Sequence, residues 1–241
     1  LFAAIHESGH GLYEQGLPRE HFGNALGEAA GMAVHESQSR IWENQVARSR
    51  PFWQYWEPRM RQQFPAQLSA VDSETLYRAI NAVALNPIRV DSDEVTYNLH
   101  ILLRFELEKR FFRGELAVED LPEAWNALSE NILGLTPRND AEGCLQDIHW
   151  SGGAFGYFPS YTLGNMLAAQ LWYAARGELP DLDEQLAAGN CGPLLQWLRK
   201  TLHRHGKRYD AREIAVRASG HELGSSSLMA YLRERYGALY L

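Results

Sequence analysis

The five residues His6-Glu7-Ser8-Gly9-His10 lie in a helical stripe that runs over residues 2–15. Residues spaced three and four apart form the stripe, and these are Phe2, Ile5, His6, Gly9, His10 and Tyr13. On a helix, positions i and i+4 face the same side, so His6 and His10 can hold one metal ion together. Glu7 follows the first histidine and can point toward a water bound to that metal. The stretch therefore predicts a helix that carries a hydrolytic metal site.

The opposing interpretation of this stretch is a pair of partly exposed surface histidines that bind nothing. Three features favour the metal. The helix is otherwise apolar enough to be buried, and a buried histidine needs a polar partner. Ser8 and Gly9 are small, so we expect them to leave room beside the metal. A candidate third ligand also lies downstream.

A third ligand is expected on a second helix. Glu36, within residues 31–38 (GMAVHESQ), would complete a set of two histidines and one carboxylate that leaves a fourth position open for water. Zinc held in this way lowers the pKa of its water toward about 7, and Glu7 can then take the proton during attack on a carbonyl. On position alone, the competing candidates are Glu28, His35 and Glu43.

The rest of the chain reads as helices separated by breaks, so the sequence predicts an all-α fold in a single catalytic region over residues 1–241. A long helix is expected from about Asn24 to Arg48, with Asn24 as its N-cap. Residues 88–90 are expected to be a short extended piece. The glycine-rich residues 143–156 indicate a loop or a helix junction.

Composition excludes several classes of protein. The formal net charge is −7, with acids and bases interspersed, whereas nucleic-acid binding needs clustered Lys and Arg. No apolar run of about 18 residues could span a bilayer. The only cysteines, Cys144 and Cys191, lie far apart, which indicates a reducing cytoplasm and argues against a cysteine-ligated metal.

Several separated stretches resemble the carboxypeptidase Taq family of zinc carboxypeptidases. The metal-binding helix of that family is similar to residues 6–15 (HESGHGLYEQ), and the block with its third ligand is similar to residues 35–44 (HESQSRIWEN). Residues 143–150 (GCLQDIHW) fit a further family motif fully. Residues 88–93 (IRVDSD) are similar to another motif, with Ser92 where the family usually has Ala.

The resemblance implies His6, His10 and Glu36 as the metal ligands, with Zn2+ as the ion and Co2+ or Mn2+ able to take its place. It also implies an all-α, gluzincin-like metallopeptidase half, and a few short strands near the active site are a further expectation. Family members are about twice this length. We therefore expect a catalytic half without the family's N-terminal half, and a homodimer.

Release of C-terminal residues from peptides is the activity that the resemblance implies. Such an enzyme must hold a free carboxylate, and a buried arginine offers two parallel N–H donors for it. Arg89 is the candidate, since its motif gives no helical reason for an arginine. The competing interpretation is an ion pair with the acids that follow it, Asp91, Asp93 and Glu94.

His149 is a candidate donor to the oxyanion that forms when water adds to the peptide carbonyl. Tyr157 and Tyr161 lie on a glycine-rich turn that can carry a phenol over the zinc. The competing interpretation is that one or both tyrosines are packing residues with a locally bonded hydroxyl. Asp147 and Gln146 are candidates for orienting a ligand imidazole through its other nitrogen.

Two alternatives to this function are open. One is a related helical zinc oligopeptidase or dipeptidyl carboxypeptidase, which cuts further from the terminus. The other is a truncated, non-catalytic metal-binding or assembly module, against which the retention of Glu7 argues, because a scaffold has no use for a general base. The basic residues around His203 and His205 are expected to form a solvated helix face.

Overall fold

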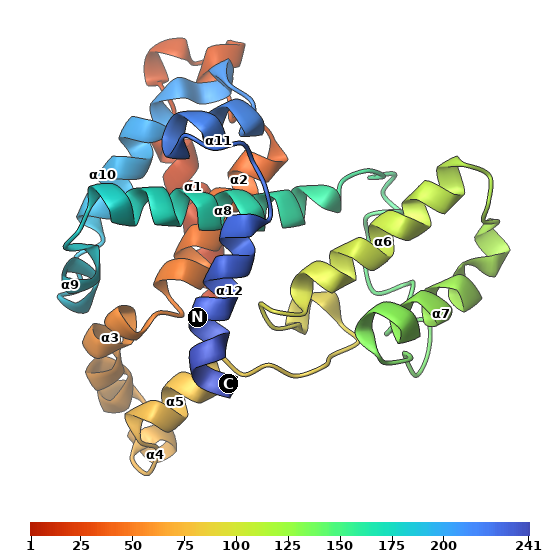
Figure 1. The fold of residues 1–241 in the computed structure, drawn as a ribbon, viewed down its shortest axis with the longest axis horizontal. Coiled ribbons are helices and arrows are strands. Elements are labelled where there is room, and N and C mark those ends of the chain that lie inside the picture. The colour runs from red at the N-terminus through yellow and green to blue at the C-terminus, as the bar shows by residue number, and fades with distance from the viewer. The chain divides into compact units, whose positions relative to one another are not determined.

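The computed structural model describes residues 1–241, which form helices joined by loops and no β-strand (Figure 1). The all-α prediction is therefore confirmed, and the expected short strands are wrong. Only Ile88 of residues 88–90 is extended, because Arg89–Asp91 form a short 3-10 helix, η4. None of the helices combines the length and the hydropathy needed to cross a membrane.

Internal contacts divide the chain into two compact units. The first unit consists of Leu1–Asn81 and Leu163–Leu241, and the second unit consists of Ala82–Thr162. The helical region expected over the whole chain is thus organised as two units, each with its own apolar core. Helix α8, Pro159–Glu178, begins among the residues of the second unit and continues into the first.

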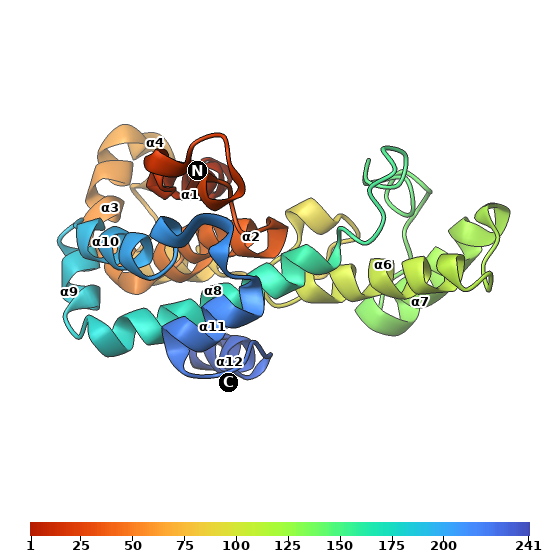
Figure 2. The same cartoon turned by 90° about the horizontal axis from the view of Figure 1, so that it is seen from above.

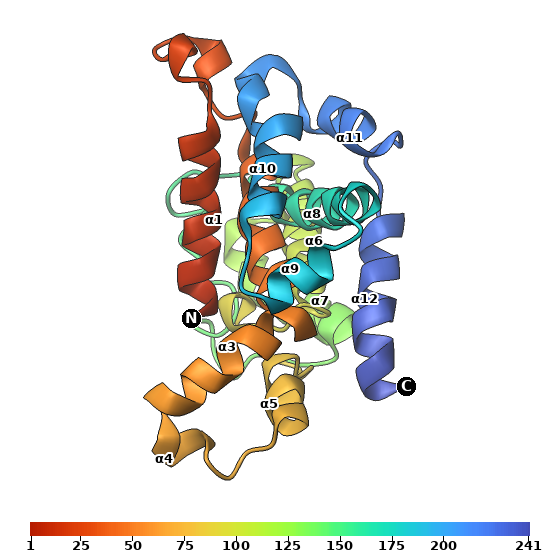
Figure 3. The same cartoon turned by 90° about the vertical axis from the view of Figure 1, so that its left-hand side faces the viewer.

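The first unit contains the α-helices α1 (Phe2–Gly16), α2 (Met32–Arg40), α3 (Arg50–Gln63), α4 (Pro65–Leu68), α5 (Ser73–Ile80), α9 (Leu182–Ala187), α10 (Gly192–Thr201), α11 (Ala211–Ser219) and α12 (Ser226–Tyr240). It also contains the 3-10 helices η1 (Arg19–His21), η2 (Ala25–Gly27) and η6 (His203–Arg208) and the π-helix η3 (Ile41–Val46). The second unit holds η4, α6 (Tyr97–Phe112), η5 (Val118–Asp120) and α7 (Leu121–Leu133). Figures 2 and 3 show α1 and α12 on opposite sides of the first unit, with α8 and α10 between them.

Helix α8 supplies much of the core of the first unit. Its residues Leu167 and Leu171 are 0% exposed and join one apolar cluster with Tyr13 of α1, Trp42 of η3 and Leu198 of α10. Burial of each leucine side chain stabilises the fold by about 1.5–3 kcal/mol relative to exposure. The cluster therefore holds α1, η3, α8 and α10 together.

Two glycines let α2 lie close to its neighbours on both sides. A Cβ atom on Gly9 of α1 would lie 2.6 Å from the carbonyl oxygen of Gln38, and one on Gly164 of α8 would lie 2.7 Å from Cβ and Cγ of Glu36. No larger residue fits at such separations without moving a helix. The expectation that Gly9 leaves room beside a metal is thus wrong, because Gly9 faces the backbone of α2. Ser8 is exposed.

The long helix expected from Asn24 to Arg48 begins later than predicted. Asn24 does act as an N-cap, but of η2, where its side chain accepts a hydrogen bond from the amide of Leu26 at 3.0 Å. Gly31 then precedes α2 with a φ of 111°, a backbone conformation that glycine adopts without strain. Helix α2 passes directly into the π-helix η3.

The core of the second unit lies between α6 and α7. Leu103 and Leu107 of α6 pack with Trp125 and Leu128 of α7. A second cluster joins Tyr97 and Ile101 of α6 to Phe158, and Trp150 and Tyr161 pack against it. The second unit therefore has apolar clusters of its own, which can hold its polar residues in position.

His203 corrects one expectation about the basic segment near it. Its ring is 0% exposed, and its Nε2 atom lies 2.8 Å from Oε1 of Gln38. Burial lowers the pKa of His203 to about 3. His203 is therefore a neutral core residue rather than part of a solvated helix face, and His205 is half-buried.

Candidate metal centre

Helix α1 presents His6 and His10 toward the same point, as their spacing predicts. Their Nε2 atoms are 3.2 Å apart. The Oε2 atom of Glu36 on α2 lies 3.6 Å from Nε2 of His6 and 3.5 Å from Nε2 of His10. Three potential ligand atoms from two helices thus form a nearly equilateral triangle.

The triangle fits a tetrahedrally coordinated divalent ion. Atoms bound about 2.0–2.1 Å from zinc at tetrahedral angles lie about 3.3–3.4 Å from one another. The observed edges run from 3.2 to 3.6 Å. Two imidazoles and one carboxylate would leave a fourth tetrahedral position for water or substrate, which is the pattern of catalytic rather than structural sites.

His6 is held through its Nδ1 atom by Glu43 of η3. Oε2 of Glu43 lies 2.8 Å from that nitrogen and accepts a hydrogen bond from Arg40 at 3.1 Å. Arg48 lies 3.8 Å from the other carboxylate oxygen. Burial raises the pKa of Glu43, but the hydrogen bond from His6 and the charge of Arg40 outweigh it and lower that pKa below its ordinary value. Glu43 is therefore a charged acceptor at neutral pH.

His10 is held through its Nδ1 atom by a second histidine. Nδ1 of His35 is 2.6 Å away, and Nε2 of His35 lies 2.8 Å from Oε1 of Glu14. Burial lowers the pKa of His10, and the charge of Glu36 opposes that change. His10 is thus favoured in its neutral form, the form that binds metal ions.

Glu36 is held in place by α2 itself. Its Oε1 atom accepts a hydrogen bond from Nε of Arg40 at 2.7 Å, and its Oε2 atom accepts one from Oγ of Ser39 at 3.2 Å. The side chain is only 6% exposed. One oxygen is therefore committed to Arg40, while the other faces the two histidines.

The competing candidates for the third ligand have other partners. His35 and Glu43 contact the ligand imidazoles from the far side, at Nδ1. Glu28 is paired with Nζ of Lys207 at 3.4 Å. The geometry therefore favours Glu36. It also gives His35 and Glu43 contacts that their positions in the sequence did not indicate.

Helix α1 is more open than its sequence suggested. Only Gly9 and Tyr13 are buried, and the side chains of His6 and His10 are 18% and 22% exposed. The expected burial of this helix is wrong, so the distances between ligand atoms are what indicate a metal. Glu7 is exposed, and its charge weakly opposes the lowering of the pKa of His10 that burial causes.

Arg89 is buried in the second unit, and its partner is distant in sequence. Its Nε and Nη2 atoms donate to Oδ1 of Asp147 at 3.1 and 2.6 Å, and its Nη1 atom donates to the hydroxyl of Tyr97 at 3.0 Å. The carboxylate of Asp93 caps the turn before α6 by accepting from the amide of Thr96. The pairing of Arg89 is therefore nonlocal.

Asp147 joins two arginines of the second unit. Its Oδ2 atom accepts a hydrogen bond from Nε of Arg104 at 2.6 Å, while Oδ1 is taken by Arg89. Gln146 supports the same loop, because its Oε1 atom accepts a hydrogen bond from the backbone amide of Arg89. Two guanidinium groups thus share one carboxylate, which leaves a formal charge of about +1 on the cluster. Arg104 was not singled out by the sequence.

His149 lies with both candidate tyrosines in the second unit. Its Nε2 atom is 3.0 Å from the hydroxyl of Tyr161, and its ring centroid is 5.4 Å from that of Tyr157. Its ring also packs against that of Phe158, with centroids 4.3 Å apart, and burial lowers the pKa of His149. The structure therefore brings these three polar side chains together within one unit.

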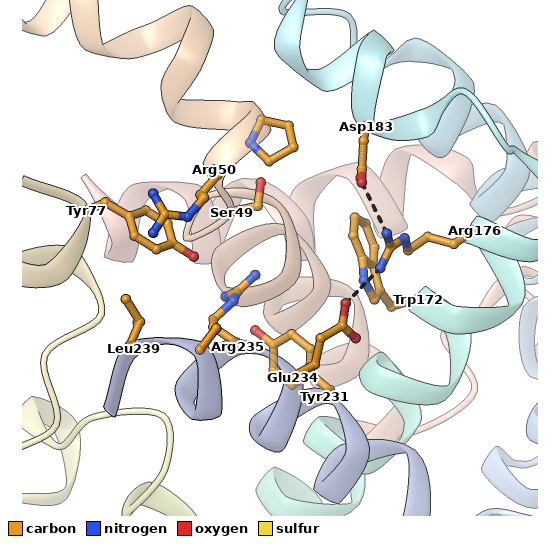
Figure 4. Close-up of a pocket in the computed structure, with 12 residues that line it drawn as sticks. Ser49, Arg50, Tyr77, Trp172, Arg176, Asp183, Tyr231, Glu234, Arg235 and Leu239 are labelled. Carbon is orange, nitrogen blue, oxygen red and sulfur yellow. Dashed lines mark hydrogen bonds and ion pairs between the residues drawn. The ribbon is translucent and has the colours of Figure 1, made fainter. Parts of the chain in front are cut away.

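A separate pocket of the first unit has a volume of about 220 Å³ and is lined by arginines and aromatic rings (Figure 4). Arg176 donates to Asp183 at 3.1 Å and to Glu234 at 3.4 Å. Arg50 pairs with a glutamate at 2.7 Å, and Arg235 donates to two backbone carbonyls at 2.6 and 3.1 Å. Each guanidinium that lines the pocket is therefore already engaged within the unit.

Comparison with known proteins gives consistent matches over the whole chain. The family described as carboxypeptidase Taq (M32) metallopeptidase matches residues 1–236. Thermostable carboxypeptidase 1 of Thermus thermophilus is 50% identical over 240 residues, and carboxypeptidase 1 of Bacillus subtilis is 44% identical over 241 residues. The crystal structure of an M32 carboxypeptidase from Deinococcus radiodurans superposes with a TM-score of 0.96 at 46% identity.

The matches cover only part of each relative. All of this chain is covered in these comparisons, against 47% of the Thermus protein, 48% of the Bacillus protein and 48% of the Deinococcus structure. The chain thus spans about half the length of the relatives that it matches.

Proposed function

Because the chain belongs to the carboxypeptidase Taq (M32) metallopeptidase family, we propose that it is the metal-binding part of a carboxypeptidase that hydrolyses C-terminal residues from peptides. The observation that carries the proposal is the triangle of His6, His10 and Glu36, whose edges of 3.2 to 3.6 Å fit one divalent ion.

Zinc is the proposed ion, and His6, His10 and Glu36 are its proposed ligands. When bound there, it would act as a Lewis acid toward the substrate carbonyl and lower the pKa of a water. Cobalt or manganese fits the same donor set. The neutral form of His10, favoured by burial, supports the assignment.

Glu7 is the proposed general base. It follows His6 on α1, is exposed to solvent, and its charge acts on His10. A carboxylate in this position can take the proton of the attacking water and pass it to the leaving amine. The role requires a charged, accessible oxygen close to the ligand helix, and Glu7 supplies one.

Arg89 is the proposed partner of the substrate's C-terminal carboxylate. Arg89 and Arg104 together carry one more positive charge than Asp147 neutralises. The Nη1 atom of Arg89 is bonded to the neutral hydroxyl of Tyr97, a partner that an incoming carboxylate can replace with a stronger charge-assisted bond.

His149, with Tyr161 or Tyr157, is proposed to donate hydrogen bonds to the oxyanion of the transition state. His149 and Tyr161 are bonded to each other at 3.0 Å, and a substrate oxygen could take the place of that contact. Removal of one such donor typically costs about 2.7–4 kcal/mol of transition-state stabilisation.

We also propose the substrates, the cellular location and the oligomeric state of the enzyme. Peptides are the proposed substrates, and the net charge of −7 supports peptides over nucleic acids. A cytoplasmic location is supported by the two free cysteines, Cys144 and Cys191. A homodimer is supported by the family resemblance.

Metal content and peptide hydrolysis, measured together on this chain and on its Glu7→Gln variant, test the proposal. We expect about one zinc ion per chain in both proteins, because the variant keeps all three ligands. C-terminal residues should be released one at a time by the parent and not by the variant. Release of dipeptides would indicate the related oligopeptidase activity instead. Absence of stoichiometric metal from the parent would contradict the assignment of His6, His10 and Glu36.

A further inference from the structure

Each histidine of the proposed metal site has its second nitrogen occupied by a partner. Nε2 of His6 and of His10 belongs to the triangle, and Nδ1 of each is within hydrogen-bond distance of another side chain. A neutral imidazole that binds a metal through Nε2 carries its hydrogen on Nδ1 and needs an acceptor there. The partners at Nδ1 therefore decide which nitrogen is available to the metal.

We infer that Glu43 and His35 are positioning residues that fix the tautomer and orientation of His6 and His10, and that Glu43 is the stronger of the two. This inference rests on the proposed function, because it assigns a role around the same three ligands. It concerns residues that do not themselves touch the ion.

Glu43 acts on His6 directly. A charged carboxylate can only accept hydrogen bonds, so a contact of 2.8 Å requires the hydrogen to lie on Nδ1 of His6. The carboxylate is itself fixed, because its side chain is 13% exposed and it is paired with Arg40 and Arg48. His6 is thus held by a charge that is already in place before a metal binds.

His35 acts on His10 through a relay. Its Nε2 atom lies 2.8 Å from Glu14, another acceptor, so its hydrogen lies on Nε2 and its Nδ1 atom is free to accept from His10 at 2.6 Å. The end of this relay is open to water, since the side chain of Glu14 is 57% exposed. Water can replace Glu14 as the acceptor, whereas it has little access to Glu43.

Arg40 links the two carboxylates of α2 and η3. It donates to Oε1 of Glu36 at 2.7 Å and to Oε2 of Glu43 at 3.1 Å. One guanidinium therefore holds a proposed ligand and the partner of another proposed ligand in a fixed relation.

Zinc affinity, measured by competition with a chromogenic chelator, tests the inference on this chain and three variants. Glu43→Gln should weaken zinc binding by about 10–100-fold, the usual effect of losing an outer partner of a ligand. Glu14→Gln should weaken it less, because water takes over as acceptor. Glu28→Gln is the matched control, since it removes the same charge from an exposed residue of the first unit that is paired with Lys207, and it should leave the affinity unchanged.

Two further readouts separate positioning from loss of fold. The zinc-dependent rise in the thermal unfolding midpoint should shrink in Glu43→Gln, whereas a purely structural defect would lower the midpoint equally with and without zinc. Long-range proton–nitrogen NMR of the metal-free chain should show the hydrogen of His6 on Nδ1, and a mixture of tautomers in the variant.

The outcomes are distinguishable. A parent chain that binds no zinc would contradict the proposed function itself. A parent that binds zinc while Glu43→Gln binds it equally well would overturn the inference and leave the proposed function standing. An equal loss in Glu14→Gln and Glu43→Gln would overturn the assignment of Glu43 as the stronger partner.

Discussion

In the first unit the proposed site residues sit on regular helices, whereas in the second unit loops and the short helix η4 carry most of them. His6 and His10 occupy one face of α1, and Glu36 faces them from α2. Arg89 and Asp147, by contrast, come from segments 58 residues apart that meet beside α6. The first arrangement gathers acceptors suited to a cation, and the second retains positive charge suited to an anion.

The two units depend on different physical properties. The site in the first unit depends on how closely two helices approach, because its ligands are spread over both. The cluster in the second unit depends on charge balance, because its buried arginines are stable only while Asp147 is charged. Changes to backbone spacing should therefore be most damaging in the first unit, and changes to charge most damaging in the second.

The largest expected effect is in the second unit. Asp147→Asn keeps the shape of the side chain but leaves the charges of Arg89 and Arg104 buried without their partner, which should cost about 3–5 kcal/mol of unfolding free energy. Chemical denaturation measures it. Glu142→Gln, which breaks the exposed pair with Arg138, is the control and should cause no measurable change. A small loss in Asp147→Asn would mean that charge balance does not govern this cluster.

A smaller effect is expected from backbone spacing in the first unit. Gly9→Ala places a Cβ atom 2.6 Å from the carbonyl of Gln38, so α1 and α2 must separate, at a cost of about 1–3 kcal/mol. Zinc affinity should fall with stability, because the two helices share the proposed ligands. Gly11→Ala on the same helix meets nothing within 4 Å and should stabilise the chain by about 0.5–1 kcal/mol. Equal effects of the two substitutions would contradict the role of close approach.

The smallest effect is a pH dependence carried by His203. Its pKa is about 3 in the folded chain, well below the ordinary value of 6.5, because it is buried. Between these values the unfolded chain binds more protons, so stability is fully present above about pH 6.5 and is lost as the pH falls toward 3. Lowering the pH from 7 to 5.5 should cost about 1 kcal/mol through this residue.

Chemical denaturation at the two pH values, on the parent and on His203→Gln, measures that contribution. Glutamine can still donate to Gln38 but does not titrate, so the variant should lose about 1 kcal/mol less between the two pH values. An unchanged difference would show that His203 is not responsible.

The sequence predicted those parts of the site that are local. The spacing of His6 and His10 places them on one helical face whatever the rest of the chain does. Glu36 could not be chosen by position, since Glu43 lies two turns further along the same helical run and both face α1. The resemblance to a family favoured Glu36, and its Oε2 atom lies 3.6 Å from His6 and 3.5 Å from His10.

Contacts between segments that lie far apart in the chain could not be predicted from the sequence. Arg89 has acids next to it in the chain, yet its carboxylate partner is Asp147, because Asp93 is used to cap the turn before α6. His203 stands in a basic segment, and its local pattern indicated solvent, but η6 turns its ring into the core. The sequence suggested that Gly9 leaves room beside the metal, because it does not reveal that Gly9 packs against the backbone of Gln38 on α2.

The π-helix η3 has a consequence for aligning this chain with its relatives. A wide turn closed by a bond of 2.9 Å from the amide of Ala47 to the carbonyl of Trp42 accommodates one residue more than an α-helical turn. A relative with a one-residue gap after Glu43 would straighten this turn and keep the carboxylate beside its histidine. A gap between Arg40 and Glu43 would instead rotate that carboxylate by about 100° around the helix axis. The position of a single gap in the alignment therefore matters. After Glu43 the gap only changes the helix type, whereas before Glu43 it removes the partner of His6.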